Sequence, residues 1–143
     1  MSNRTKILII EDNPGDVLLV SEALLHKGIE AEIQHVETAS AAIAAVQGIH
    51  ANSPSIPELI LLDYSLPGGT APDVLLAIQR NPVLAGVPRA VLTCSVAPKD
   101  RERALSAGAD VFVYKPADLD EFLESVGSAV LNMLAQRQHL LPE

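Results

Sequence analysis

Short apolar runs alternate with helical patterns along this 143-residue chain, and this alternation limits the possible folds more than any other feature. It is the sequence signature of a parallel sheet built from strand–helix–strand units. Only the second run alternates with polar residues, Glu32 and Gln34, which predicts an edge strand. We expect five strands, at 7–10, 31–36, 59–62, 90–93 and 111–114.

Helical patterns fill the segments between and after these strands. The first helix is expected to begin at Asn13-Pro14, because Asn caps free N–H groups and Pro is tolerated in a first turn. It is expected to end at Gly28. The later helices are expected from about Ser40 to Val46, Pro72 to Asn81, Pro98 to Gly108 and 119 to 137.

No linker, repeat or low-complexity tract interrupts this pattern. We therefore expect an α/β fold with a doubly wound five-stranded parallel sheet, forming one domain over 1–143. The helix at about 119–137 would be an extended C-terminal helix, and no output domain is expected.

The chain is acidic, with a formal net charge of −8. That charge argues against nucleic acid as a direct partner. No apolar segment approaches the ~18 residues that span a bilayer, and no cleavable leader is recognised, so we expect a cytoplasmic protein without membrane contact. The single cysteine, Cys94, excludes an intrachain disulfide and is expected to be a small buried apolar residue.

Polar residues stand where the predicted strands end. Glu11 and Asp12 follow the first strand, Asp63 the third, and Lys115 the fifth, while Thr93 ends the fourth. Because functional residues of such sheets gather at the carboxyl ends of the strands, we expect three carboxylates, a hydroxyl and an ammonium group to converge. Taken singly, Asp63 could cap a turn and Lys115 could be a surface lysine, so the prediction depends on the whole set.

Three crowded carboxylates repel one another unless a cation lies between them, and hard oxygen ligands suit Mg²⁺. An aspartate carboxylate can also attack phosphorus and form an acyl phosphate. Phosphoryl transfer depends on positioning and on neutralising charge, which Mg²⁺ and Lys115 would provide.

Four motifs carry a resemblance to a known family. They are ILIIEDNPGD at 7–16, LILLDYSLPGG at 59–69, AVLTCS at 90–95 and VFVYKPAD at 111–118. In this order and spacing they resemble the receiver domain of two-component response regulators, from about Lys6 to Leu134. The resemblance implies a CheY-like, flavodoxin-like fold with strand order 2-1-3-4-5. EDNPGD and NPVLAGVP at 81–88 further resemble the small single-domain regulators that pair with bacterial phytochromes.

The resemblance also implies a function, namely phosphorelay signal transduction. Asp63 would be the phosphoacceptor, and Thr93 and Lys115 would hold the phosphoryl oxygens. Mg²⁺ would be the cofactor. Its ligands would be Asp63, Glu11, Asp12 and the backbone carbonyl of Ser65.

In such receivers, phosphorylation changes the conformation. Thr93 would move toward the phosphoryl group while Phe112 turns inward, and the Lys115–Pro116 bond is expected to be cis. The chain would promote its own phosphorylation and dephosphorylation without being a dedicated enzyme.

The implied partners are proteins. A sensor histidine kinase or histidine phosphotransfer protein would dock on the first helix, whose apolar face from Val17 to Leu25 is wider than a single buried stripe. A downstream protein would bind the switched conformation. A homodimer through Met133 and Leu134 is a further expectation.

Other functions stay open. The main alternative is a receiver-like interaction module that is never phosphorylated, but such modules usually lack one of the acids, the hydroxyl or the lysine. A haloacid dehalogenase-type phosphatase would need a second Asp where this chain has Ser65. A flavodoxin-like flavin carrier needs a phosphate-binding first loop, and this loop is acidic.

Overall fold

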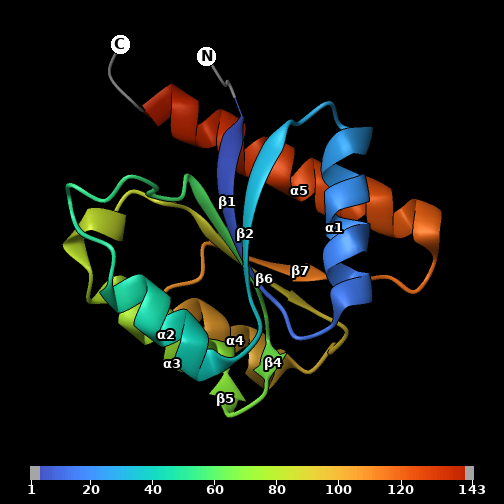
Figure 1. The fold of residues 1–143 in the computed structure, drawn as a ribbon. Helices are drawn as coiled ribbons and strands as arrows, with labels where there is room; N and C mark the ends of the chain where they lie inside the picture. Colours follow the sequence, from blue (N-terminus) through green and yellow to red (C-terminus); the bar gives the residue numbers. More distant parts are fainter. Residues whose placement is uncertain (1–3, 141–143) are drawn as a thin grey trace.

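The predicted strands form one parallel sheet. The computed structural model describes residues 4–140, and its five-stranded sheet has the order β2-β1-β3-β6-β7 (Figure 1). This is the predicted doubly wound α/β arrangement, with the alternating second strand at an edge. The strands are β1 (Thr5–Ile10), β2 (Ala31–Val36), β3 (Leu59–Asp63), β6 (Arg89–Thr93) and β7 (Val111–Tyr114).

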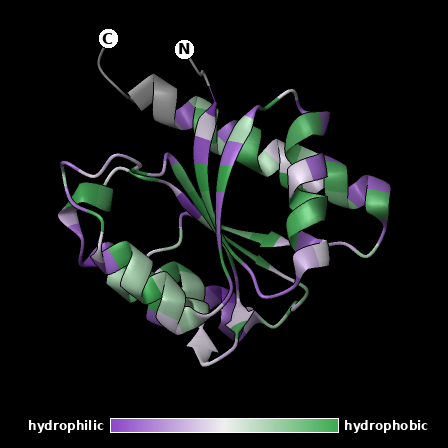
Figure 2. Ribbon diagram, in the orientation of Figure 1, coloured by the Kyte–Doolittle hydropathy of each residue, from purple (hydrophilic) through white to green (hydrophobic). Residues whose placement is uncertain are grey.

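Two helical layers cover the sheet. α1 (Pro14–His26) and α5 (Leu119–Leu140) lie on one face, and α2 (Ala39–Gln47), α3 (Ala71–Gln79) and α4 (Pro98–Ser106) lie on the other. Because both faces are covered, the central strands are apolar along nearly their whole length, as Figure 2 shows.

Successive strand residues point to opposite faces of the sheet and so contribute to two separate hydrophobic cores. In β1, Ile7 and Ile9 pack toward α1 and α5, whereas Leu8 and Ile10 pack toward α2, α3 and α4. Both faces of β1 are apolar, so its register is kept by the fit of each side chain into its own core and by the ladders to β2 and β3. The same packing also fixes the position of the carboxyl end of β1.

Helix ends follow the expected local chemistry. The Asn13 side chain caps α1 by accepting a hydrogen bond from the Gly15 N–H (2.8 Å). Gly28 (φ +72°) follows α1 and Gly108 (φ +117°) follows α4, each with the left-handed backbone that glycine adopts most easily. None of the helices within residues 4–140 has the length and apolar character needed to cross a bilayer.

Two short elements were not predicted. A hairpin of β4 (Ser65–Leu66) and β5 (Gly69–Thr70) turns at Pro67-Gly68, where Gly68 has φ +81°. A 3₁₀ turn, η1 (Pro82–Leu84), precedes β6. The buried Arg89 guanidinium donates to the carbonyl oxygens of Leu84 (2.8 Å) and Val87 (2.9 Å) and so holds this turn against the sheet.

The helices differ in how firmly they are anchored. α1 and α5 pack closely at Gly127, where an added Cβ would lie 2.8 Å from the Ala23 carbonyl oxygen. In α4, by contrast, Ala104 is the only buried residue, and the rest of the helix is largely charged or polar. α4 is therefore less firmly anchored than α1 and α5.

Gly127→Ala tests this close packing. Alanine favours a helix over glycine by about 1 kcal/mol, but backbone atoms of α1 occupy the space of the new methyl group. We expect the clash to dominate and to lower the free energy of unfolding by about 1–3 kcal/mol, measured by urea denaturation followed by circular dichroism.

Gly86→Ala is the matched control, because no atom lies within 4 Å of its added Cβ. It should leave the stability nearly unchanged. A Gly127→Ala protein as stable as the control variant would contradict the close contact between α1 and α5.

Candidate functional site

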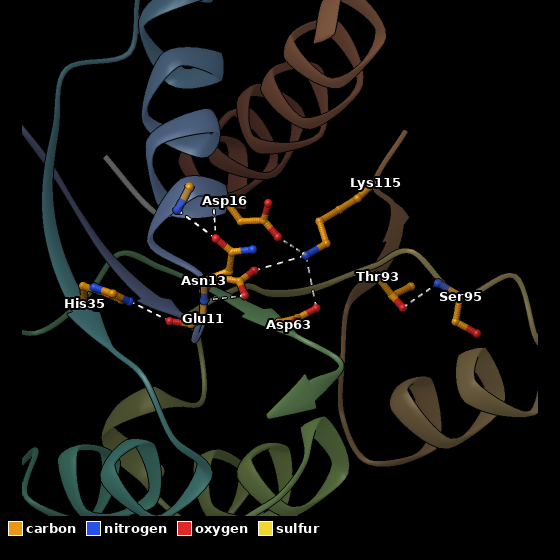
Figure 3. A network of polar contacts seen from close by, with 9 residues as sticks. Glu11, Asn13, Asp16, His35, Asp63, Thr93, Ser95 and Lys115 are labelled. Atoms are coloured by element: carbon orange, nitrogen blue, oxygen red, sulfur yellow. Dashed lines mark hydrogen bonds and ion pairs between the residues drawn. The ribbon is translucent and has the colours of Figure 1, made fainter. Parts of the chain in front are cut away.

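The polar residues predicted to converge lie together where the strands end. Glu11 and Asp12 follow β1, Asp63 is the last residue of β3, and Lys115 follows β7 (Figure 3). One carboxylate oxygen from each of the three acids lies within 4.8 Å of the others. The sheet thus brings together side chains that are about fifty residues apart along the chain.

The Lys115 ammonium group is surrounded by carboxylates. Its Nζ lies 3.1 Å from Glu11 Oε1, 3.0 Å from Asp16 Oδ2 and 3.3 Å from Asp63 Oδ1. An ammonium group has three N–H donors, and here each has a carboxylate within reach. Lys115 and Glu11 are buried, so these interactions are little screened by solvent.

Negative charge exceeds positive charge in this cluster. Four carboxylates, those of Glu11, Asp12, Asp16 and Asp63, share one ammonium group, which leaves three net negative charges if all are ionised. Burial raises the pKa of Glu11 to about 7 although Lys115 opposes it, and burial likewise raises the pKa of Asp63. Burial disfavours the charged form of Lys115, but the bond to Asp16 and the charges of Asp63 and Glu11 raise its pKa overall.

The donor set fits a hard divalent cation. Glu11, Asp12 and Asp63 offer carboxylate oxygens, and a 2+ ion would offset much of the excess negative charge. Asp12 is exposed, which leaves one side of the cluster open for the water ligands that Mg²⁺ usually keeps. Ser65, the source of the fourth implied ligand, is exposed and begins β4, and its role as a ligand stays a prediction.

Thr93 lies at the end of β6, and its hydroxyl is engaged within its own loop. Thr93 Oγ1 accepts a hydrogen bond from the Ser95 N–H at 2.9 Å. The Ser95 hydroxyl in turn donates to Asp100 Oδ2 (2.7 Å) and accepts from the Ala97 N–H (3.1 Å). A movement of Thr93 toward Asp63 would therefore release the Ser95 N–H and disturb the start of α4.

Phe112 is half-buried on β7 and packs beside an aromatic residue that sequence reasoning did not single out. Its ring meets that of Tyr64 edge-on, at a centroid distance of 6.3 Å and an angle of 78°. Tyr64 directly follows Asp63, and its hydroxyl interacts with Asp100 and Arg103 of α4. Burial, with the Asp100 charge, raises the pKa of Tyr64. Its position next to Asp63 was the available signal.

Asp16 was also missed. It lies in the first turn of α1, inside the quoted motif EDNPGD, but the motif alone does not show that its side chain reaches Lys115. A contact between residues separated by 99 positions can be known only once the fold places α1 beside the end of β7.

Two expectations were wrong. Cys94 is exposed, because it follows the last paired residue of β6 and faces away from the buried side of Thr93. The Lys115–Pro116 bond is trans, the form that X–Pro bonds favour by about 0.5–1 kcal/mol. Met133 is buried and Leu134 is partly buried against the α1/α5 core. The expected homodimer stays a prediction.

Comparison with known proteins shows which protein family this chain is similar to. The family model of the response regulator receiver domain matches residues 7–127. Response regulator Rcp1 of Synechocystis is 34% identical over 122 residues, which cover 84% of this chain and 82% of Rcp1. The probable methanogenesis regulatory protein FilR2 of Methanothrix harundinacea is 29% identical over 120 residues, covering 84% of this chain and 77% of FilR2.

Comparison with solved structures indicates the same family. The phosphorylated cyanobacterial phytochrome response regulator RcpA superposes with a TM-score of 0.82 at 28% identity, covering 93% of this chain and 96% of RcpA. The Mn²⁺-bound form of Rcp1 gives a TM-score of 0.75 at 32% identity, covering 87% and 90% of the two chains. The resemblance to phytochrome-associated regulators is thereby confirmed, and the chain belongs to the response regulator receiver domain family.

Proposed function

We propose that this chain accepts a phosphoryl group on Asp63 in an Mg²⁺-dependent reaction and passes the resulting conformational change to a partner protein. The observation that carries the proposal is the placement of Asp63 between two further carboxylates and the Lys115 ammonium group, in a chain of the receiver family. The phosphorylated RcpA and Mn²⁺-bound Rcp1 structures support it by similarity.

The donor is proposed to be a phosphohistidine of a sensor histidine kinase or histidine phosphotransfer protein. A carboxylate oxygen of Asp63 attacks phosphorus, a P–O bond forms, and the P–N bond to the histidine breaks. The imidazole leaves with the bonding electron pair and takes a proton from solvent. Asp63 is suited to this attack because it stands at a strand end and is partly accessible.

The neighbouring residues stabilise the charge of the transferring group and form no covalent bond with it. Mg²⁺, held by Glu11, Asp12, Asp63 and the Ser65 carbonyl, would offset the negative charge of the transferring phosphoryl group. Lys115 donates to a phosphoryl oxygen from the opposite side, at a position it already occupies beside Asp63. Hydrolysis of the acyl phosphate then resets the receiver, so the chain acts as a switch and not as a dedicated enzyme.

The proposed switch is the β6–α4 loop. Once a phosphoryl oxygen is present, the Thr93 hydroxyl can donate to it and ceases to hold the Ser95 N–H. Phe112 turns inward against the neighbouring Tyr64 as Thr93 leaves. Because Tyr64 and Ser95 both contact Asp100, the two changes reach α4 together.

The kinase or phosphotransfer protein is proposed to dock on α1. Leu18 and Leu25 are 67% and 63% exposed, and they lie about two turns apart on one side of the helix. This surface is next to the Asp63 end of the sheet, because α1 begins beside the site (Figure 3). A downstream protein, or a second copy of the chain, would read the switched surface.

Phosphorylation by a small donor tests the central proposal. Purified protein incubated with phosphoramidate and Mg²⁺ should gain one phosphoryl group by intact mass. The gain should be lost without Mg²⁺ and in Asp63→Asn. Asp120→Asn, an exposed acid in the first turn of α5, is the matched control and should be phosphorylated normally. A folded wild-type protein that never gains mass would favour the module that acts through binding alone.

Mg²⁺ binding should depend on pH. The pKa of Glu11 is about 7 in the metal-free protein and that of Asp63 is raised as well. A proton therefore competes with the metal below neutral pH. Titration calorimetry from about pH 5.5 to about pH 8 should show an affinity that rises with pH and levels off above about 7, with protons released on binding at the acidic end. Equal affinity across this range would contradict the raised pKa values.

The raised pKa of Glu11 has the opposite pH dependence for stability: without metal, it lowers the free energy of unfolding as pH rises. A carboxyl whose pKa is raised in the folded state binds protons more tightly there than in the unfolded chain. Glu11 therefore favours the fold most below about pH 4.5, and this contribution is lost as pH rises toward about 7. Saturating Mg²⁺ should remove this loss.

Hydrogen exchange at one amide tests the switch. The Ser95 N–H is held by Thr93 Oγ1, so it should exchange slowly in the resting protein and faster after phosphorylation, measured by NMR. In Thr93→Ala it should exchange fast in both states. The Ala41 N–H, held by Thr38 Oγ1 at 3.0 Å, is the matched control and should not respond. An unchanged Ser95 amide in phosphorylated wild type would remove Thr93 from the switch.

A further inference from the structure

Asp16 makes a contact in the site that no phosphoryl or metal role requires. Its Oδ2 lies 3.0 Å from Lys115 Nζ, the shortest of the three contacts made by that ammonium group. Figure 3 shows Asp16 approaching Lys115 from the α1 side, away from Asp63. The contact joins the first turn of α1 to the end of β7.

Asp16 is held in place by the helix start. Its backbone N–H donates to the Asn13 carbonyl oxygen (3.1 Å) and lies 3.4 Å from Asn13 Oδ1, the oxygen that caps α1. The carboxylate thus projects from a fixed turn. A lysine side chain, in contrast, is a flexible four-carbon stem whose direction depends on its partners.

Asp16 also differs in kind from the other two partners of Lys115. Glu11 and Asp63 belong to the metal-binding cluster, and Asp16 does not. When a metal ion binds Glu11 and a phosphoryl group is attached to Asp63, these two carboxylates interact with the new groups. Their attraction for the Lys115 ammonium group is then weaker. Asp16 is then the one partner among the described residues that can keep its bond to the ammonium group throughout the reaction.

We propose that Asp16 is a positioning residue that holds the Lys115 ammonium group in line with the phosphoryl oxygens during transfer to Asp63. The inference rests on the proposed phosphorylation and deepens it. Fixing the ammonium group beforehand removes the need to order a long side chain in the transition state. Asp16 touches neither the phosphoryl group nor the metal, so it acts only through Lys115.

The test measures the rate of phosphorylation by phosphoramidate at saturating Mg²⁺ in Asp16→Asn. This variant keeps the size of the side chain and removes its charge. By analogy with carboxylates that orient metal-ligating side chains, we expect the maximal rate to fall about tenfold. The affinity for Mg²⁺, measured by calorimetry, should stay within about twofold, because Asp16 is outside the metal cluster. Asp16→Glu should recover part of the rate.

A double-mutant cycle separates positioning from a general structural effect. If Asp16 acts through Lys115, then Asp16→Asn should cause no further loss of rate in a Lys115→Ala background. A structural role would slow both backgrounds. Glu22→Gln, which removes an exposed charge elsewhere on α1, is the matched control and should leave the rate unchanged.

The outcomes distinguish this inference from the proposed function. Wild-type protein that is never phosphorylated overturns both. Phosphorylated wild type with an equally fast Asp16→Asn variant overturns the positioning role alone. So does a loss of rate that persists in the Lys115→Ala background, or one that is matched by an equal loss of Mg²⁺ affinity.

Discussion

A single buried ammonium group facing a cluster of carboxylates is the interaction on which this end of the molecule depends. Lys115 comes from the end of β7, and its partners come from the end of β1, the end of β3 and the first turn of α1. Each of these segments is held by packing elsewhere, so the charges cannot move apart to relieve their repulsion. The chain therefore carries an electrostatic imbalance that burial maintains and that a divalent cation or a change of protonation reduces.

This imbalance would make the proposed site responsive to a metal ion. If the carboxylates were fully neutralised by the protein itself, a metal ion would gain little by binding. Burial raises the pKa of Glu11 to about 7, so the net charge of the site changes near neutral pH through this residue, and burial raises the pKa of Asp63 as well. The Thr93 hydroxyl accepts a hydrogen bond within its own loop, so in the proposed switch it exchanges one partner for another at modest cost.

Most of the fold could be predicted from sequence, because both faces of the sheet are buried and the apolar runs therefore mark the strands directly. The residues at the strand ends followed from the same reasoning. The β4–β5 hairpin was missed although Pro67-Gly68 is a turn signal, because two-residue strands leave no periodicity to detect. Asp16, Tyr64 and the exposure of Cys94 depend on how distant segments pack, which a single sequence does not state. The extent of the domain and the absence of an output domain stay predictions.

The weak anchoring of α4 has a consequence for where a signal can leave the molecule. Only Ala104 of this helix is buried, whereas α1 and α5 meet backbone to backbone at Gly127. Displacing a helix costs roughly the apolar area it uncovers, so α4 needs far less free energy to shift than either helix of the opposite layer. A force applied at the end of β6 is thus divided unequally, and α4 yields to it more readily than α1 or α5. In the proposed switch, this difference in anchoring favours α4 as the helix through which the signal leaves the molecule.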